Sequence, residues 1–118
     1  AESYLRGKQD LPMAIGYLNQ IRERANLNPY SGAQTYEAVF NDLERQRAIE
    51  FFVEGERFYD LRRWGLLEKT MNEYFAIERT RFDWFNDARF TAGRDEYFPI
   101  SQPQMNYSKG NYTQNPGY

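Results

Sequence analysis

The charged residues best placed to do chemistry lie between residues 45 and 65, at positions that a helix normally gives to its core. An apolar stripe at helical spacing precedes them, formed by Tyr36, Val39, Phe40 and Leu43. Steps of three or four residues continue that stripe into charges: Arg47, Glu50, Glu54 and Arg57. Their signs balance, and apolar residues crowd both sides. We therefore predict a buried or half-buried structural ion network, extended past Gly55 by Asp60 and Arg63.

Glu50 and Glu54 share one helix face, which is also the spacing of paired catalytic or metal-binding carboxylates. A di-metal helix bundle needs Glu-x-x-His motifs, and the chain has no histidine. A glycosidase needs two carboxylates beside an open groove, whereas Arg47 and Arg57 flank this pair and favour charge pairing. The spacing predicts a structural role, with no catalytic residue, no metal site and no cofactor.

A second candidate site is the aromatic group Phe82, Trp84 and Phe85, which alternates with carboxylates and amides. Aromatic faces suit the C–H side of a sugar ring, and neighbouring polar groups suit its hydroxyls. These three residues are the sugar-stacking candidates of the chain. The alternative is an ordinary loop whose rings pack on the helices.

Three motifs in the chain resemble those of the SusD/RagB family of cell-surface glycan-binding lipoproteins. Residues 45–65 resemble its pattern R-x-x-E-(apolar)-x-x-E-G-x-R-(aromatic)-x-D-L-R-R-W-G. Residues 17–25, YLNQIRERA, resemble the family's Y-L-N-x-I-R-x-R-A helix. Phe98-Pro99-Ile100 and the closing QNPGY of residues 114–118 resemble its P-I-P and Q-N-P-G-Y ending, with Ser101 where a second proline is common.

The resemblance implies a C-terminal piece of a longer protein, because family members are several times longer. It implies a surface-exposed lipoprotein of the outer membrane, with the anchor outside this chain. The implied role is to bind an oligosaccharide or polysaccharide and pass it to a SusC-like TonB-dependent transporter, with the N-terminal part of the same protein as a further partner. None of the three motifs carries the family's glycan site.

Composition agrees with a small domain and excludes several partners. The 118 residues fit one domain, and the net charge of −2 with no basic run predicts no nucleic-acid partner. The chain has no cysteine, and no apolar run approaches the roughly 18 residues of a membrane-spanning helix. Aromatic residues are unusually frequent, at 18%. Either the core of this small domain is built from large rings, or some of the rings stack on sugars.

Hydrophobic periodicity predicts a mainly α fold. We expect helices over about 10–27, 35–54, 57–64 and 66–79, with 80–118 forming an irregular, aromatic-rich wrap. The first two helices, joined by a short loop, predict an antiparallel hairpin of tetratricopeptide type. A helical protein–protein interaction scaffold with no ligand of its own is the alternative function, and a glycoside hydrolase is a weaker third.

Overall fold

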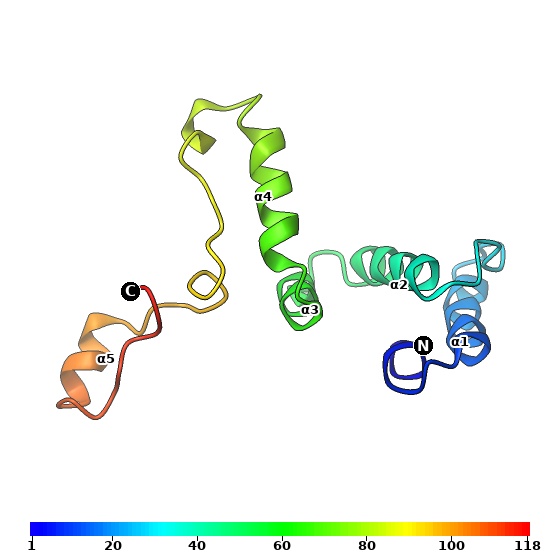
Figure 1. Cartoon of the computed structure of the whole chain (residues 1–118), viewed down its shortest axis with the longest axis horizontal. Helices are drawn as coiled ribbons and strands as arrows, with labels where there is room; N and C mark the ends of the chain where they lie inside the picture. The colour runs from blue at the N-terminus through cyan, green and yellow to red at the C-terminus, as the bar shows by residue number, and fades with distance from the viewer. The chain divides into compact units, whose positions relative to one another are not determined.

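The computed structural model describes residues 1–118, and all of its regular elements are helices, without a strand (Figure 1). Its α-helices are α1 (Leu11–Arg24), α2 (Tyr36–Glu50), α3 (Glu56–Trp64), α4 (Leu67–Glu78) and α5 (Gln102–Tyr107). A π-helical segment, η1 (Ser3–Lys8), precedes α1, and a 3₁₀ turn, η2 (Asp83–Phe85), follows α4. The predicted mainly α fold is confirmed. The chain divides into two compact units, residues 1–57 and 58–118, where the sequence predicts one domain.

In the first unit, the helix starts are set by side-chain caps. Asp10 accepts a hydrogen bond from the Met13 N–H at 3.1 Å, and Pro12 lies in the first turn, where a missing N–H costs little. Thr35 caps α2 in the same way, accepting from the Ala38 N–H at 3.3 Å. Both starts fall within one residue of their predicted positions.

The first unit buries its core between η1, α1 and α2. Its buried apolar residues are Leu5, Ala14, Leu18, Val39 and Leu43. Two of the four residues of the predicted stripe on α2, Val39 and Leu43, are therefore buried, and Tyr36 at its start is exposed.

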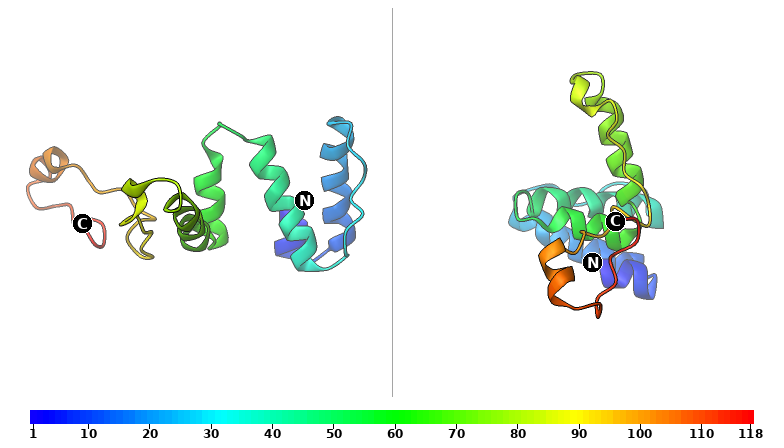
Figure 2. Two further views of the ribbon diagram at one scale, coloured as in Figure 1. Left: turned by 90° about the horizontal axis from the view of Figure 1, so that it is seen from above. Right: turned by 90° about the vertical axis from the view of Figure 1, so that its left-hand side faces the viewer.

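Helices α1 and α2 run in the same direction, which corrects the expected antiparallel hairpin (Figure 2). Their first residues, Leu11 and Tyr36, line a common cavity, and Arg24 at the end of α1 pairs with Glu50 at the end of α2. The physical reason is the length of the connection. The 14 residues of α1 span about 21 Å, and residues 25–35 reach up to about 36 Å when extended, enough to return along the helix.

Helix α2 ends at Glu50 and not at Glu54 as predicted. Residues 51–55 form a turn in which Val53 and Gly55 take left-handed conformations, with φ of 63° and 81°. Phe52 and Val53 are 74% and 89% exposed in this turn. Because these two apolar side chains stay largely exposed, they gain little burial energy that would favour extending the helix.

In the second unit, α3 and α4 form the core. Gly65, with φ of 73°, ends α3 in a Schellman motif: the Leu66 N–H donates to the Leu61 carbonyl at 2.8 Å, and the Gly65 N–H to Arg62 at 3.1 Å. Leu61, Leu67 and Phe90 are buried together. Partly buried residues surround them, namely Phe58, Leu66, Met71 and Phe75.

Residues 80–118 are mostly irregular, with one correction. A short helix, α5, forms at Gln102–Tyr107 and has proline in its first turn, where that residue is tolerated. The rest of the segment is attached to the helices by side chains. Asn72 of α4 accepts from the Phe90 N–H at 2.9 Å and donates to the Phe90 carbonyl at 3.1 Å. These two bonds give Phe90 what a neighbouring strand would otherwise supply.

Candidate functional site

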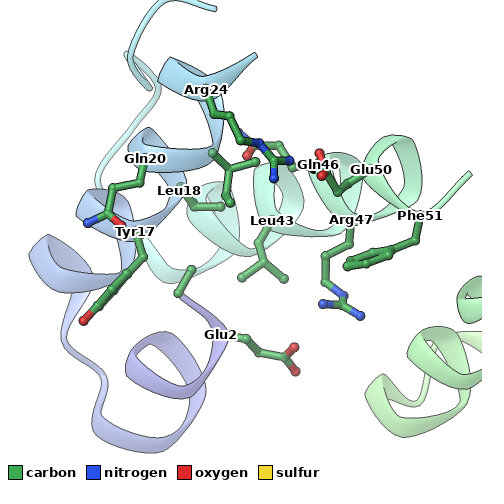
Figure 3. A pocket seen from close by; sticks show the side chains of 12 residues that line it. Glu2, Tyr17, Leu18, Gln20, Arg24, Leu43, Gln46, Arg47, Glu50 and Phe51 are labelled. Atoms are coloured by element: carbon green, nitrogen blue, oxygen red, sulfur yellow. Dashed lines mark hydrogen bonds and ion pairs between the residues drawn. The ribbon is translucent and has the colours of Figure 1, made fainter. Parts of the chain in front are cut away.

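A pocket of about 470 Å3 opens in the first unit, lined by α1, α2 and the residues before η1 (Figure 3). Leu18 and Leu43 give it apolar walls, and Glu2, Arg24 and Arg47 bring charge to it. The Gln46 Oε1 atom is buried there without a hydrogen-bond partner.

Two members of the predicted ion network, Arg47 and Glu50, line this pocket. Glu50 pairs with Arg24 of α1, and Arg47 lies over the Phe51 ring at 4.7 Å. The charged groups of Glu50 and Arg47 are therefore both in contact with other side chains of the protein. Two carboxylates line the pocket, and each pairs with an arginine: Glu2 with Arg6 and Glu50 with Arg24.

The other predicted network residues do not line this pocket. Arg57 donates to Glu44, outside the predicted set, at 2.7 Å, and Glu54 is exposed. In the second unit, Asp60 is buried and accepts from Arg63 at 2.8 Å. These pairs involve several of the six predicted residues, and a network that includes all six stays a prediction.

The predicted aromatic group forms a stack on the loop that follows α4. Phe82 and Trp84 lie nearly parallel, with ring centroids 4.6 Å apart and planes at 19°. Trp84 is 74% exposed and Phe82 is 40% exposed. Phe85 is half-buried and contacts Tyr74 and Phe75 of α4 at 6.1 and 6.0 Å.

Two arginines missed by sequence reasoning position these regions. Arg79 donates to the Phe85 carbonyl at 3.1 Å and also to the Ala88 carbonyl, which fixes the aromatic loop on the end of α4. Arg22 donates to the Asn28 carbonyl at 2.7 Å and pairs with Asp42 at 3.4 Å, tying α1 to its loop and to α2. Arg22 belongs to the YLNQIRERA motif and Arg79 to none of the three motifs. The sequence does not show the partners of either arginine, because the fold brings those residues close.

No group of three or more acidic, cysteine or histidine side chains is arranged to hold a metal ion. No helix is both long and apolar enough to cross a membrane.

The sequence profile of the SusD family matches residues 1–118, the whole of this chain. The chain belongs to the SusD family. It is also similar to the crystal structure of a SusD superfamily protein from Bacteroides vulgatus ATCC 8482, with 47% identity and a TM-score of 0.79. That match covers 99% of this chain and 24% of the other, so the chain spans about a quarter of that protein's length. None of the curated proteins matches this chain.

The ending that resembles the SusD motif closes on the Phe98-Pro99-Ile100 segment. The Gln114 side chain donates to the Ile100 carbonyl and accepts from the Ile100 N–H, both at 2.8 Å. Asn115 donates to the Phe98 carbonyl at 2.6 Å, and the Tyr118 hydroxyl donates to the Tyr97 carbonyl at 3.0 Å. These bonds give two of the SusD motifs a structural role, because one holds the backbone of the other.

Gly117 is required within this ending. Its φ is 83°, and a Cβ added there would lie 2.6 Å from the Arg94 Cγ atom. Arg94 is itself held by Asp95 at 2.6 Å. A larger residue at position 117 would meet both backbone strain and a fixed neighbour.

Proposed function

We propose that this chain is the C-terminal region of a cell-surface nutrient-binding protein that captures glycans and passes them to a SusC-like TonB-dependent transporter. The observation that carries the proposal is the SusD family match over residues 1–118. The similarity to a SusD superfamily structure at 47% identity supports it.

The proposal extends to the protein that contains the chain. The similar structure is about four times longer, since the match covers 24% of it. We infer that the remaining N-terminal part of the protein packs with this region and holds most of the glycan. We further infer a lipid anchor outside this chain and a location on the outer face of the outer membrane.

We also infer that the chain is not an enzyme. The acidic residues of the pocket between α1 and α2 are the clearest candidates for catalysis, and Glu50 among them is paired with Arg24. The full-length gene product should release no reducing sugar from a broad glycan panel. Release above the level of a Glu50→Gln variant would contradict this.

The proposed uptake role is tested with the full-length gene product and intact cells. The purified protein should bind at least one soluble glycan by calorimetry, and a tagged copy should co-purify with a TonB-dependent transporter from detergent-solubilised outer membranes. Added proteinase K should digest the protein on intact cells. Absence of glycan binding across the panel, or full protection from the protease, would overturn the proposal.

A helical interaction scaffold is the second candidate, and one observation favours it. Ile49, Phe52 and Val53 form an exposed apolar group at the end of α2, 66%, 74% and 89% exposed. Such groups commonly mark contacts with other protein surfaces. A Phe52→Asp variant that loses transporter co-purification, in a protein that binds no glycan, would favour the scaffold over the nutrient-binding role.

A further inference from the structure

We propose that the outer face of Trp84, backed by Phe82, is a contact surface for a neutral oligosaccharide. The proposal rests on the nutrient-binding function above and assigns it a specific site. It also separates the three aromatic residues of the loop, because Trp84 faces the ligand, Phe82 backs it and Phe85 supports both.

The geometry of the stack leaves one large ring face open. Phe82 covers one side of Trp84 at a centroid distance of 4.6 Å and an interplanar angle of 19°. Trp84 nevertheless remains 74% exposed, so its other side faces solvent. An open indole face is electron-rich, and the C–H side of a pyranose ring carries partial positive charge that suits it.

Contacts with Phe85 and with α4 hold the stacked pair of Phe82 and Trp84 in place. Phe85 packs between the platform and α4, with ring contacts to Phe82 at 6.5 Å and to Phe75 at 6.0 Å. Arg79 fixes the backbone of the same loop by donating to the carbonyls of Phe85 and Ala88. A surface that is ordered before the ligand arrives loses less conformational entropy on binding.

The polar groups beside the rings favour a neutral sugar. Asp83, Asn86 and Asp87 are exposed, and their side chains bond to no other group, so their oxygens can accept hydrogen bonds from sugar hydroxyls. Arg81 is engaged by Glu78 at 3.3 Å. The two free carboxylates would repel a uronic acid, and Arg89 is the single unengaged cation of the loop.

Phe52 provides the comparison that makes the site specific. Its side chain is as exposed as Trp84, at 74%, but it has no stacked ring and its neighbour Val53 is apolar. Exposure alone therefore does not distinguish the two residues. Trp84 differs from Phe52 because the Phe82 ring is stacked behind it and hydrogen-bonding side chains lie beside it in the sequence.

The experiment measures binding of maltoheptaose, cellohexaose, xylohexaose and hexagalacturonate to the full-length gene product by calorimetry. Trp84→Ala should weaken binding of the preferred neutral oligosaccharide about tenfold, because it removes the stacking face. Trp84→Phe should retain most of the affinity, and the matched control Phe52→Ala should bind as the unsubstituted protein does.

Hydroxyl-radical footprinting with mass spectrometry provides the second readout. Trp84 should be labelled in the free protein and protected when the oligosaccharide is bound, and Phe52 should be labelled equally in both states. If Trp84 is unlabelled in the free protein, another part of the protein covers it and the proposal is overturned.

The outcomes separate this site from the general function. If the unsubstituted protein binds a neutral oligosaccharide and Trp84→Ala binds it equally well, the Trp84 site is wrong and the nutrient-binding role stands. Preference for hexagalacturonate would overturn the assignment of a neutral ligand. If the unsubstituted protein binds none of the four, both proposals fail for these glycans.

Discussion

The α1–α2 region and the segment from Phe90 to the C-terminus are held in place by different physical means. The two helices satisfy their own backbone hydrogen bonds, so only side chains need to meet between them. Apolar burial around Leu18 and Leu43 supplies that contact. The C-terminal segment has little regular structure, and amide side chains supply the bonds that its backbone lacks, as Asn72 does for Phe90 and Gln114 for Ile100.

This difference predicts how each region responds to substitution. A region held by apolar burial loses stability in proportion to the volume removed and tolerates changes of individual polar residues. A region held by single amides depends on each one, because a lost partner leaves a backbone group unpaired. Substitutions of both kinds test the comparison.

The largest effect should come from Leu43→Ala in the first unit. Leu43 is 2% exposed, and removing a buried leucine side chain costs about 2–5 kcal/mol. We expect the lower part of that range, since Leu43 borders the open pocket and water can enter the space. Urea unfolding followed by circular dichroism measures the loss.

Ile49→Ala is the matched control, because Ile49 lies on the same helix and is 66% exposed. It should change the free energy of unfolding by no more than about 0.5 kcal/mol. Equal losses for the two variants would show that apolar burial does not hold the helices together.

Asn72→Ala should have the next largest effect, in the second unit. It leaves both the N–H and the carbonyl of Phe90 without a partner, and Phe90 is 9% exposed. An unpaired group of this kind costs about 1–3 kcal/mol. Hydrogen exchange at the Phe90 amide should become faster, while exchange within α2 should not change.

Asn86→Ala is the control for the amide itself, because the Asn86 side chain is exposed and makes no hydrogen bond. It should leave exchange at Phe90 unchanged. Faster exchange throughout both units after Asn72→Ala would indicate global destabilisation and contradict a local clamp.

Sequence reasoning located what local chemistry determines. Asp10 and Thr35 mark the starts of α1 and α2, because caps are short-range signals. The predicted end of α2 differs from the observed one by four residues, Glu54 against Glu50. Helical periodicity continues into a segment whose Phe52 and Val53 side chains stay exposed. The direction of α2 was missed because the connection is long enough to permit either orientation.

The candidate site was predictable to a similar extent. The residue pattern identified Phe82, Trp84 and Phe85 as a group. Only the structure shows that Phe85 packs against α4 while Trp84 stays exposed. The ion network was predicted from one stripe on one helix. Partners from elsewhere, Arg24 for Glu50 and Glu44 for Arg57, were not predictable because their separation in sequence carries no periodic signal.

Smaller losses of stability are expected at Glu44 and Glu54. The sequence predicts an ion-network role for Glu54, whereas the structure pairs Glu44 with Arg57. Glu44 is partly buried and pairs with Arg57 at 2.7 Å, so Glu44→Ala should cost about 1 kcal/mol or less. Glu54 is exposed, and Glu54→Ala should change the free energy of unfolding by no more than about 0.5 kcal/mol. Chemical denaturation of both variants measures the difference. A larger loss from Glu54→Ala would restore the predicted role of Glu54.

The smallest effect concerns Asp95, whose ionisation should make the stability of the C-terminal segment depend on pH. Hydrogen bonds from Arg94 and then from the Thr91 N–H lower the pKa of Asp95 below its ordinary value of 3.8. The folded state therefore binds this proton less readily than the unfolded chain does. The resulting stability is present above the unfolded pKa and is lost as pH falls through the folded pKa.

Carboxyl-carbon NMR titration should place the Asp95 midpoint below the ordinary aspartate value of 3.8. Asp95→Asn should weaken the acid-induced release of the C-terminal segment, because its amide does not gain a proton in this range. Asp87→Asn should leave that release unchanged. An Asp95 midpoint at the ordinary value would show that the Arg94–Asp95 contact contributes nothing to the pH response. The side-chain hydrogen bonds of Asn72 and Gln114 would then hold this segment independently of charge.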